Sequence, residues 1–265
     1  MKQRTITGLI GGLIFISLVY LGGIWYSSLI LLLAIIALYE FLRMAEIQPF
    51  GFPALLSYIF MLSILWPSLS MDTTVEIPVH FQTILLFMLL ILLLYSVLKK
   101  NRFHIEHAAL TLLGALYIGY GFLYMAVVRH SADGNGFWLT ILILLGIWST
   151  DTGAYLIGRK WGKRKLWPAI SPNKTVEGSL GGLGFALLIV VTINQMVHAW
   201  TLSQALAIAI TTGIAAQLGD LIESGMKRHF GVKDSGHILP GHGGVLDRFD
   251  SLLFVFPTLY LLGLI

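Results

Sequence analysis

Apolar segments of about bilayer-spanning length follow one another along this chain. We mark nine with approximate ends, the last of them short, at residues 6–23, 25–45, 52–70, 81–98, 108–128, 137–157, 178–199, 203–222 and 251–265. A helix needs about 20 apolar residues to cross the hydrocarbon core, where it satisfies its own backbone hydrogen bonds. Period-two alternation, the pattern of a membrane β-barrel, does not occur. The sequence therefore predicts an all-α, polytopic integral membrane protein with about nine transmembrane helices.

The composition agrees with a membrane protein. Only 11% of the 265 residues are charged and 57% are hydrophobic, whereas about a quarter of a soluble domain is charged. The chain has no cysteine, which excludes a disulfide framework and thiolate metal sites. Its start, "MKQRTITGLIGGLIFISLVYLGG", resembles a signal peptide but lacks a clear small-x-small cleavage site, so we expect a retained first span.

The basic residues predict how the chain is threaded. With the N-terminus in the cytoplasm and nine spans, 16 of the 17 lysines and arginines fall on the inner side. These are Lys2, Arg4, Arg43, Lys99, Lys100, Arg102, Arg159, Lys160, Lys163, Arg164, Lys165, Lys174, Lys227, Arg228, Lys233 and Arg248. Only Arg129 falls outside. The asymmetry matches the positive-inside rule, so the positive excess indicates orientation rather than a nucleic-acid partner. We expect a multi-pass protein of the cell membrane.

Two polar loops stand out on the cytoplasmic side of this threading. One is "GRKWGKRKLWPAISPNKTVEGS", residues 158–179, and the other is "ESGMKRHFGVKDSGHILPGHGGVLDRFD", residues 223–250. No low-complexity tract or clear internal repeat appears. We therefore expect a single transmembrane catalytic domain over residues 1–265, with N-terminal helices in 1–135 and the catalytic helices and cytoplasmic loops in 136–265.

Carboxylates next to apolar segments are candidates for function. A charge at the bilayer centre costs about 2.5–3.5 kcal/mol on insertion scales, so it needs a partner or a wet cavity. Asp151, the pair Asp220 and Glu223, and the pair Asp247 and Asp250 all fall near the cytoplasmic ends of segments. The alternative is that such acids cap helix starts. Carboxylates that cluster need a cation, and an oxygen-rich site suits Mg²⁺.

Basic residues supply the complementary half of a phosphate site. Lys227, Arg228 and Lys233 alternate with the acids, and Ser171 and Lys174 lie in the other loop. Such groups bind phosphate oxygens through charge and hydrogen bonds. The alternative is contact with lipid headgroups, which we favour for the tryptophan-flanked bases between 159 and 165.

The "PGHGG" stretch adds backbone donors. Gly243 and Gly244 allow positive φ and close approach, so amides can point at an anion. His242 could orient a phosphate or transfer a proton, or be an ordinary packed loop residue. Acids for a divalent cation, bases for phosphates and glycine amides together favour phosphoryl-group chemistry on a lipid at the inner face of the membrane.

The stretch "SGMKRHFGVKDSGHILPGHGGVLDRFD" resembles the signature of the phosphatidate cytidylyltransferase family, also called CDP-diacylglycerol synthases. The pattern is S-x-x-K-R, four residues, K-D, a spacer, then x-H-G-G-x-x-D-R-x-D. The matching positions are Ser224, Lys227, Arg228, Lys233, Asp234, His242, Gly243, Gly244, Asp247, Arg248 and Asp250. The segments "SDTGAYLIGRKWGK", "SPNKTVEGSLGG", "RTITG" and "LYEFLRM" also resemble family segments, so the similarity covers most of the chain.

The resemblance implies transfer of the CMP moiety of CTP to phosphatidate, giving CDP-diacylglycerol and pyrophosphate. It also implies a Mg²⁺-dependent enzyme, a homodimer and a second, monovalent cation such as K⁺, with Asp220 and Asp247 as the leading metal ligands and Asp250 and Asp151 as further candidates. We expect the catalytic residues to be Asp220, Asp247, Lys227, Arg228 and His242. We expect substrate phosphates on Ser171, Lys174, Ser224, Lys233, Gly243, Gly244 and Arg248.

Two other functions are considered. A secondary transporter also carries intramembrane acids near glycine-broken helices, but here the acids gather at one interface and no inverted repeat is visible. A CDP-alcohol phosphotransferase would carry a D-G-x-x-A-R motif, which is absent.

Overall fold

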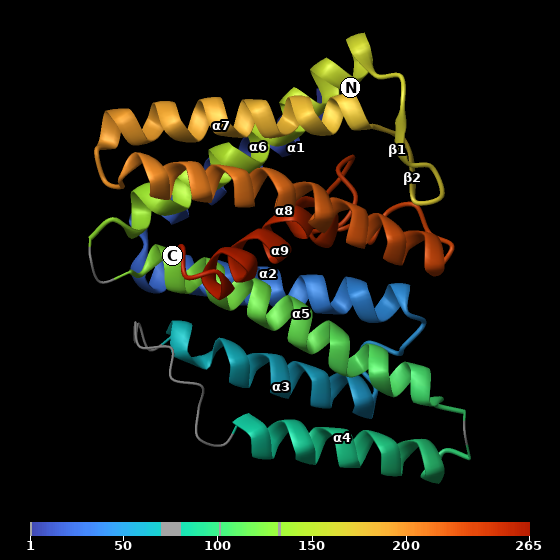
Figure 1. The fold of residues 1–265 in the computed structure, drawn as a ribbon. Helices are drawn as coiled ribbons and strands as arrows, with labels where there is room; N and C mark the ends of the chain where they lie inside the picture. The colour runs from blue at the N-terminus through green and yellow to red at the C-terminus, as the bar shows by residue number, and fades with distance from the viewer. Residues whose placement is uncertain (1, 70–80, 101, 132–133) are drawn as a thin grey trace. The chain divides into compact units, whose positions relative to one another are not determined.

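The computed structural model describes residues 2–69, 81–100, 102–131 and 134–265 (Figure 1). Within these ranges the chain forms nine α-helices and one short β-hairpin. The helices are α1 (Lys2–Leu21), α2 (Gly23–Met44), α3 (Phe52–Leu69), α4 (Phe81–Leu98), α5 (Ile105–Arg129), α6 (Gly136–Trp161), α7 (Val176–Val197), α8 (Leu202–His229) and α9 (Leu246–Leu261), and the strands are β1 (Lys165–Trp167) and β2 (Ser171–Thr175).

Six of these helices, α2 and α4 to α8, are long and apolar enough to cross a membrane among the described residues. The apolar parts of α1 and α3 are shorter, at Thr7–Leu21 and Phe52–Ser68, and α9 has 16 residues. The chain is therefore a nearly all-α, multi-pass membrane protein. The count of nine spans and the cytoplasmic N-terminus remain predictions.

The chain divides into two compact units, which are described separately. Unit 1 holds the chain up to His130 together with Val232–Arg248, and unit 2 holds Ser131–Gly231 together with Phe249–Ile265. The second polar loop of the sequence therefore belongs mostly to unit 1, although the helix that precedes it belongs to unit 2.

In unit 1, α5 packs against α2, α3 and α4, and α1 packs on α2. Gly114 lets α5 approach α2 closely, because an added Cβ would lie 2.5 Å from the Phe41 ring. At the end of α5 the Arg129 guanidinium donates hydrogen bonds to the carbonyls of Val19 (2.6 Å) and Tyr20 (3.0 Å). Those carbonyls lie in the last turn of α1, where no backbone donor remains for them. The one base predicted on the outer side is thus a helix cap.

In unit 2, α7 packs along α6 and α8. The contact between α6 and α7 includes close approaches of the two backbones at glycines. A Cβ added to Gly182 would lie 2.7 Å from the Thr150 carbonyl oxygen, and one added to Gly178 would lie 2.8 Å from that of Ala154. At these two positions the glycines therefore allow the helix backbones to approach each other directly.

One short hairpin departs from the predicted all-α fold among the described residues. Strands β1 and β2 pair antiparallel, with Lys165 opposite Thr175 and Trp167 opposite Ser171. A hydrogen bond from the Gly178 amide to Thr175 Oγ1 (3.1 Å) caps α7 directly after β2. The Glu177 carboxylate accepts the backbone amide of Lys163 at 3.0 Å. These caps tie both ends of the loop to α7, so the segment forms a hairpin in place of an irregular connection.

Candidate active site

A cavity of about 520 Å³ in unit 2 brings together predicted site residues from three elements. Asp151 comes from α6, Lys174 from β2 and Asp220 from α8, and all three line the cavity. Lys174 Nζ lies 2.6 Å from Asp220 Oδ2. The hairpin thus positions the Lys174 ammonium group beside a carboxylate on α8. A site that binds both a phosphate and a cation needs such a pair of opposite charges.

A third carboxylate, Asp250 of α9, belongs to the same charged group. Its negative charge interacts with that of Asp220, and Asp151 is close enough to be repelled by both. The Ser251 hydroxyl donates to the Ala216 carbonyl of α8 at 3.0 Å. A Cβ on Gly219 would lie 2.8 Å from the Asp250 carbonyl oxygen, so α8 and α9 meet closely here. Three acids gathered around one lysine leave a net negative charge that attracts cations.

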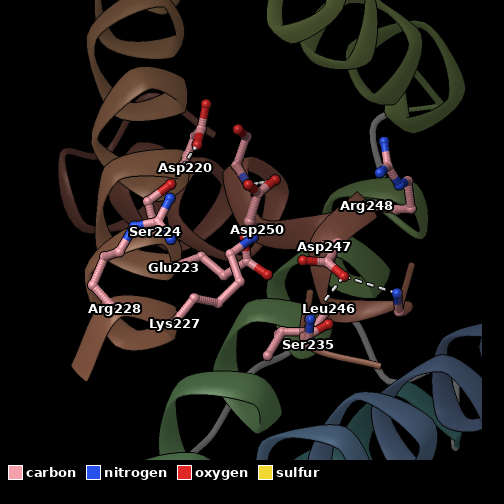
Figure 2. Close-up of polar contacts among 12 residues, drawn as sticks. Asp220, Glu223, Ser224, Lys227, Arg228, Ser235, Leu246, Asp247, Arg248 and Asp250 are labelled. Atoms are coloured by element: carbon pink, nitrogen blue, oxygen red, sulfur yellow. Dashed lines mark hydrogen bonds and ion pairs between the residues drawn. The ribbon is translucent and has the colours of Figure 1, made fainter. Parts of the chain in front are cut away.

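The last turns of α8 hold the predicted bases in defined contacts (Figure 2). The Ser224 hydroxyl donates to Asp220 Oδ1 at 3.2 Å. Lys227 Nζ pairs with Glu223 Oε2 at 2.6 Å, and the Glu223 side chain is only 2% exposed. The Arg228 Nε donates to the carbonyl of Ile170 in the hairpin turn at 3.4 Å. Lys227 and Arg228 are therefore engaged with the protein before any substrate binds.

The glycine-rich loop of unit 1 is held by Asp247, in the first turn of α9. Asp247 Oδ2 accepts the backbone amides of Ser235 (2.9 Å) and Gly244 (2.8 Å), as Figure 2 shows. The Arg248 Nε donates to the His242 carbonyl at 2.9 Å. Gly243 has φ +80°, which favours glycine. The predicted metal ligand Asp247 thus also organises the loop that precedes it.

Four predicted site residues, three expected to bind phosphate and one expected to be catalytic, share a second cavity of about 390 Å³ in unit 1. They are Lys233, His242, Gly243 and Arg248. The His242 ring also lies against Gly8 of α1, where an added Cβ would come within 2.9 Å of Nε2. His242 therefore packs against the first helix while it lines the cavity, which suits a positioning role.

Glu40 of α2 belongs to this site and was not predicted from the sequence. It is 1% exposed, and its carboxylate accepts the backbone amides of Val245 (3.0 Å) and Leu246 (2.9 Å). The available signal was a single acid inside the apolar segment 25–45, within "LYEFLRM". An acid in such a place needs a buried partner, but nothing in the sequence names a partner about 205 residues away.

The predicted site residues fall into two groups, one in each unit. Unit 2 holds Asp151, Ser171, Lys174, Asp220, Ser224, Lys227, Arg228 and Asp250, and unit 1 holds Lys233, His242, Gly243, Gly244, Asp247 and Arg248. Ser171 pairs with Trp167 at the turn end of the hairpin and is not among the residues that line the unit 2 cavity. Joint metal binding by Asp220 and Asp247 stays a prediction.

The acids of unit 2 have the chemistry of a Mg²⁺ site. Within the described ranges, no three His, Asp or Glu side chains are already arranged to hold a metal ion. However, Mg²⁺ needs only one or two carboxylates and takes its other ligands from water and substrate phosphates. The Lys174 ammonium beside Asp220 already marks a place where a cation is stabilised. The residues present therefore fit the ion.

Comparison with known proteins gives a consistent result. Residues 2–265 match the profile of the cytidylyltransferase family. The chain is 44% identical to the phosphatidate cytidylyltransferase of Staphylococcus haemolyticus (strain JCSC1435), over 99% of this chain and 98% of that protein. It is 44% identical to the Bacillus subtilis (strain 168) phosphatidate cytidylyltransferase, over 99% and 97%. It is 42% identical to that of Staphylococcus aureus (strain COL), over 99% and 98%.

Proposed function

This chain belongs to the cytidylyltransferase family, and we propose that it acts as a phosphatidate cytidylyltransferase. It transfers the CMP moiety of CTP to phosphatidate, and the products are CDP-diacylglycerol and pyrophosphate. The similarity to proteins of that name over 99% of the chain carries this conclusion. The cavity that joins acids of α6 and α8 to Lys174 supplies the charge pattern that the reaction needs.

The reaction needs charge neutralisation more than proton transfer. A phosphate oxygen of phosphatidate attacks the α-phosphorus of CTP in line, and the bond from that phosphorus to the bridging oxygen of pyrophosphate breaks. The attacking oxygen is already anionic, so no strong general base is required. His242 is therefore a positioning residue in this proposal. Lys174 and Lys233 stabilise the negative charge of the phosphates.

We assign Mg²⁺ to Asp220 and Asp247, with Asp151 and Asp250 as the acids for a second cation such as K⁺. A divalent ion bound there supplies positive charge to the phosphate oxygens. Asp220 has one carboxylate oxygen on the Ser224 hydroxyl and the other on Lys174 Nζ, so a cation bound to Asp220 would take the place of the ammonium group there. The Lys174 ammonium group would then be available to a substrate phosphate.

In the proposed threading, both substrates can reach the site. We infer nine spans with the N-terminus in the cytoplasm of a cell-membrane protein, supported by the 16-to-one distribution of lysines and arginines. Both cavities are then cytoplasmic, where CTP is dissolved, while phosphatidate stays in the inner leaflet. A homodimer is part of the proposal through the family resemblance alone.

The test uses purified protein, phosphatidate and CTP labelled at the α-phosphate, with and without Mg²⁺. We expect the label in the lipid phase and one pyrophosphate released for each labelled lipid, and no transfer without the divalent ion. Absence of labelled lipid under any condition would contradict the function. Uptake of a solute into vesicles without nucleotide consumption would favour the transporter instead.

A further inference from the structure

From the buried contacts of Glu40, we propose that this residue is a positioning residue of the active site. Its carboxylate acts on the loop of residues 235–244 and on the start of α9. The inference rests on the proposed function, since the loop it positions carries His242 and precedes Asp247. All of the contacts that support it lie within unit 1.

The burial of Glu40 is the first step of the argument. Its side chain sits on α2, a helix with an 18-residue window of mean hydropathy 1.9, and is 1% exposed. A buried carboxylate is strongly unfavourable unless hydrogen bonds compensate for the lost water. Burial of this carboxylate by itself destabilises the fold. Its presence therefore indicates that the backbone it binds must be held in one position.

The partners of Glu40 are the second step. Its two oxygens accept the amides of Val245 (3.0 Å) and Leu246 (2.9 Å), which are among the backbone donors that a helix start leaves without a helical partner. The hydroxyl of Ser235 completes the set at 3.5 Å. Glu40 therefore caps α9 from another helix, close to Asp247.

Two glycines make room for this carboxylate. A Cβ added to Gly236 would come within 2.4 Å of Glu40 Oε1, and one added to Gly244 would come within 2.5 Å of Oε2. The backbone at both ends of the loop therefore lies directly on the carboxylate. Any larger residue at either position would displace the loop from Glu40.

The third step is that Glu40 and Asp247 hold the same loop. Ser235 gives its hydroxyl to Glu40 and its amide to Asp247, and Gly244 gives its amide to Asp247 at a position where an added Cβ would meet Glu40. Asp247 by itself fixes the loop only to α9. Glu40 fixes the loop and the start of α9 to α2, so the loop cannot shift without breaking buried hydrogen bonds.

The test compares Glu40→Gln, Glu40→Asp and a control, Glu46→Gln, in the full-length enzyme. A glutamine offers one acceptor oxygen in place of two, so at least one of the two amides loses its partner. Glu46 is an exposed acid just past the end of α2. The readouts are kcat and the KM for CTP, the melting temperature, and hydrogen exchange of peptides covering 235–248.

We expect Glu40→Gln to lower kcat/KM for CTP by roughly 10- to 100-fold with a raised KM, as small misplacements of reacting groups do. Exchange should accelerate in the 235–248 peptides of this variant and remain unchanged in Glu46→Gln. Glu40→Asp keeps both oxygens and should fall between wild type and Glu40→Gln. If Glu40→Gln does not fold, the KM and exchange of Glu40→Asp decide the question.

Two results would overturn the inference alone. One is a folded Glu40→Gln enzyme with kcat/KM within about twofold of wild type and unaltered exchange. The other is a kcat that falls only as far as the fraction of folded protein falls, with an unchanged KM. A purely structural role of Glu40 would give that result. A wild-type protein that forms no CDP-diacylglycerol would overturn the proposed function together with the inference.

Discussion

Lys174 and Asp220 form an ion pair of 2.6 Å between a short β-hairpin and a membrane helix. The pair is partly exposed, with 26% and 35% of the two side chains accessible, so its own contribution to stability is small. Its importance lies in its place, at the cavity that also holds Asp151. A group that neutralises Asp220 in the free protein can neutralise a phosphate once a cation takes over that carboxylate.

Replacing Lys174 with glutamine tests this exchange. We expect the KM for CTP to rise about tenfold or more, because a charge-assisted hydrogen bond to phosphate is worth about 1.5–3 kcal/mol. The Mg²⁺ concentration for half-maximal activity should not rise, since the ammonium group no longer competes for Asp220. Lys163→Gln, an equal charge change at an exposed position, is the control. An unchanged KM with a higher Mg²⁺ requirement would contradict the assignment.

Asp220 and Asp247 should differ in what their loss does to the fold. Asp247→Asn disturbs two backbone hydrogen bonds, to Ser235 and Gly244, and we expect unfolding to become easier by about 2 kcal/mol. Asp220→Asn loses only contacts to side chains, so it should inactivate the enzyme while its melting temperature stays near wild type. Thermal unfolding in detergent, followed by tryptophan fluorescence, separates the two. Equal destabilisation would show that Asp247 has no special structural role.

Gly244 in unit 1 and Gly184 in unit 2 should tolerate alanine very differently. Gly244→Ala places a Cβ within 2.3 Å of Ser235 Oγ and 2.5 Å of the Glu40 carboxylate, so the loop must move. We expect activity to fall by roughly tenfold or more, as expected for misplaced catalytic groups. Gly184 on α7 has open space around it, and Gly184→Ala should retain full activity. Similar activity in both variants would mean that the loop position is not critical.

The threading can be tested directly because the chain has no cysteine. Lys163→Cys lies in the turn after α6 and Ser203→Cys in the first turn of α8, and both positions are exposed. A membrane-impermeant maleimide should label Ser203→Cys in intact cells and Lys163→Cys only after permeabilisation. The reverse pattern would invert the orientation, and labelling of both in intact cells would change the number of spans between them.

Most helix positions followed from the apolar segments. The segment 81–98 coincides with α4, and 52–70 differs from α3 by one residue at its end. The largest difference at a single helix end is in α8, where the apolar segment ends at residue 222 and the helix continues to His229. Its last turns are polar, but the Glu223–Lys227 pair four residues apart supports the helix beyond the apolar part.

The site was predictable in its residue types and less so in its contacts. Acids and bases near segment ends identified Asp151, Lys174 and Asp220, which the structure joins at one cavity. The hairpin was missed because its five-residue strand "SPNKT" has no strand-like alternation of apolar residues. Glu40 was missed because a capping partner far away in sequence leaves no local pattern.

The glycine contact between α6 and α7 limits how the protein can change. Where side chains separate two helices, the volume added by a larger residue on one helix can be offset by a smaller residue on the other. Where the Gly182 backbone meets the Thr150 carbonyl, no such adjustment exists, and one methyl group either fits or forces the helices apart. Asp151 follows Thr150 directly. A larger residue at Gly182 would therefore separate α6 from α7 and displace Asp151 with its helix, although Gly182 itself need not contact a reactant.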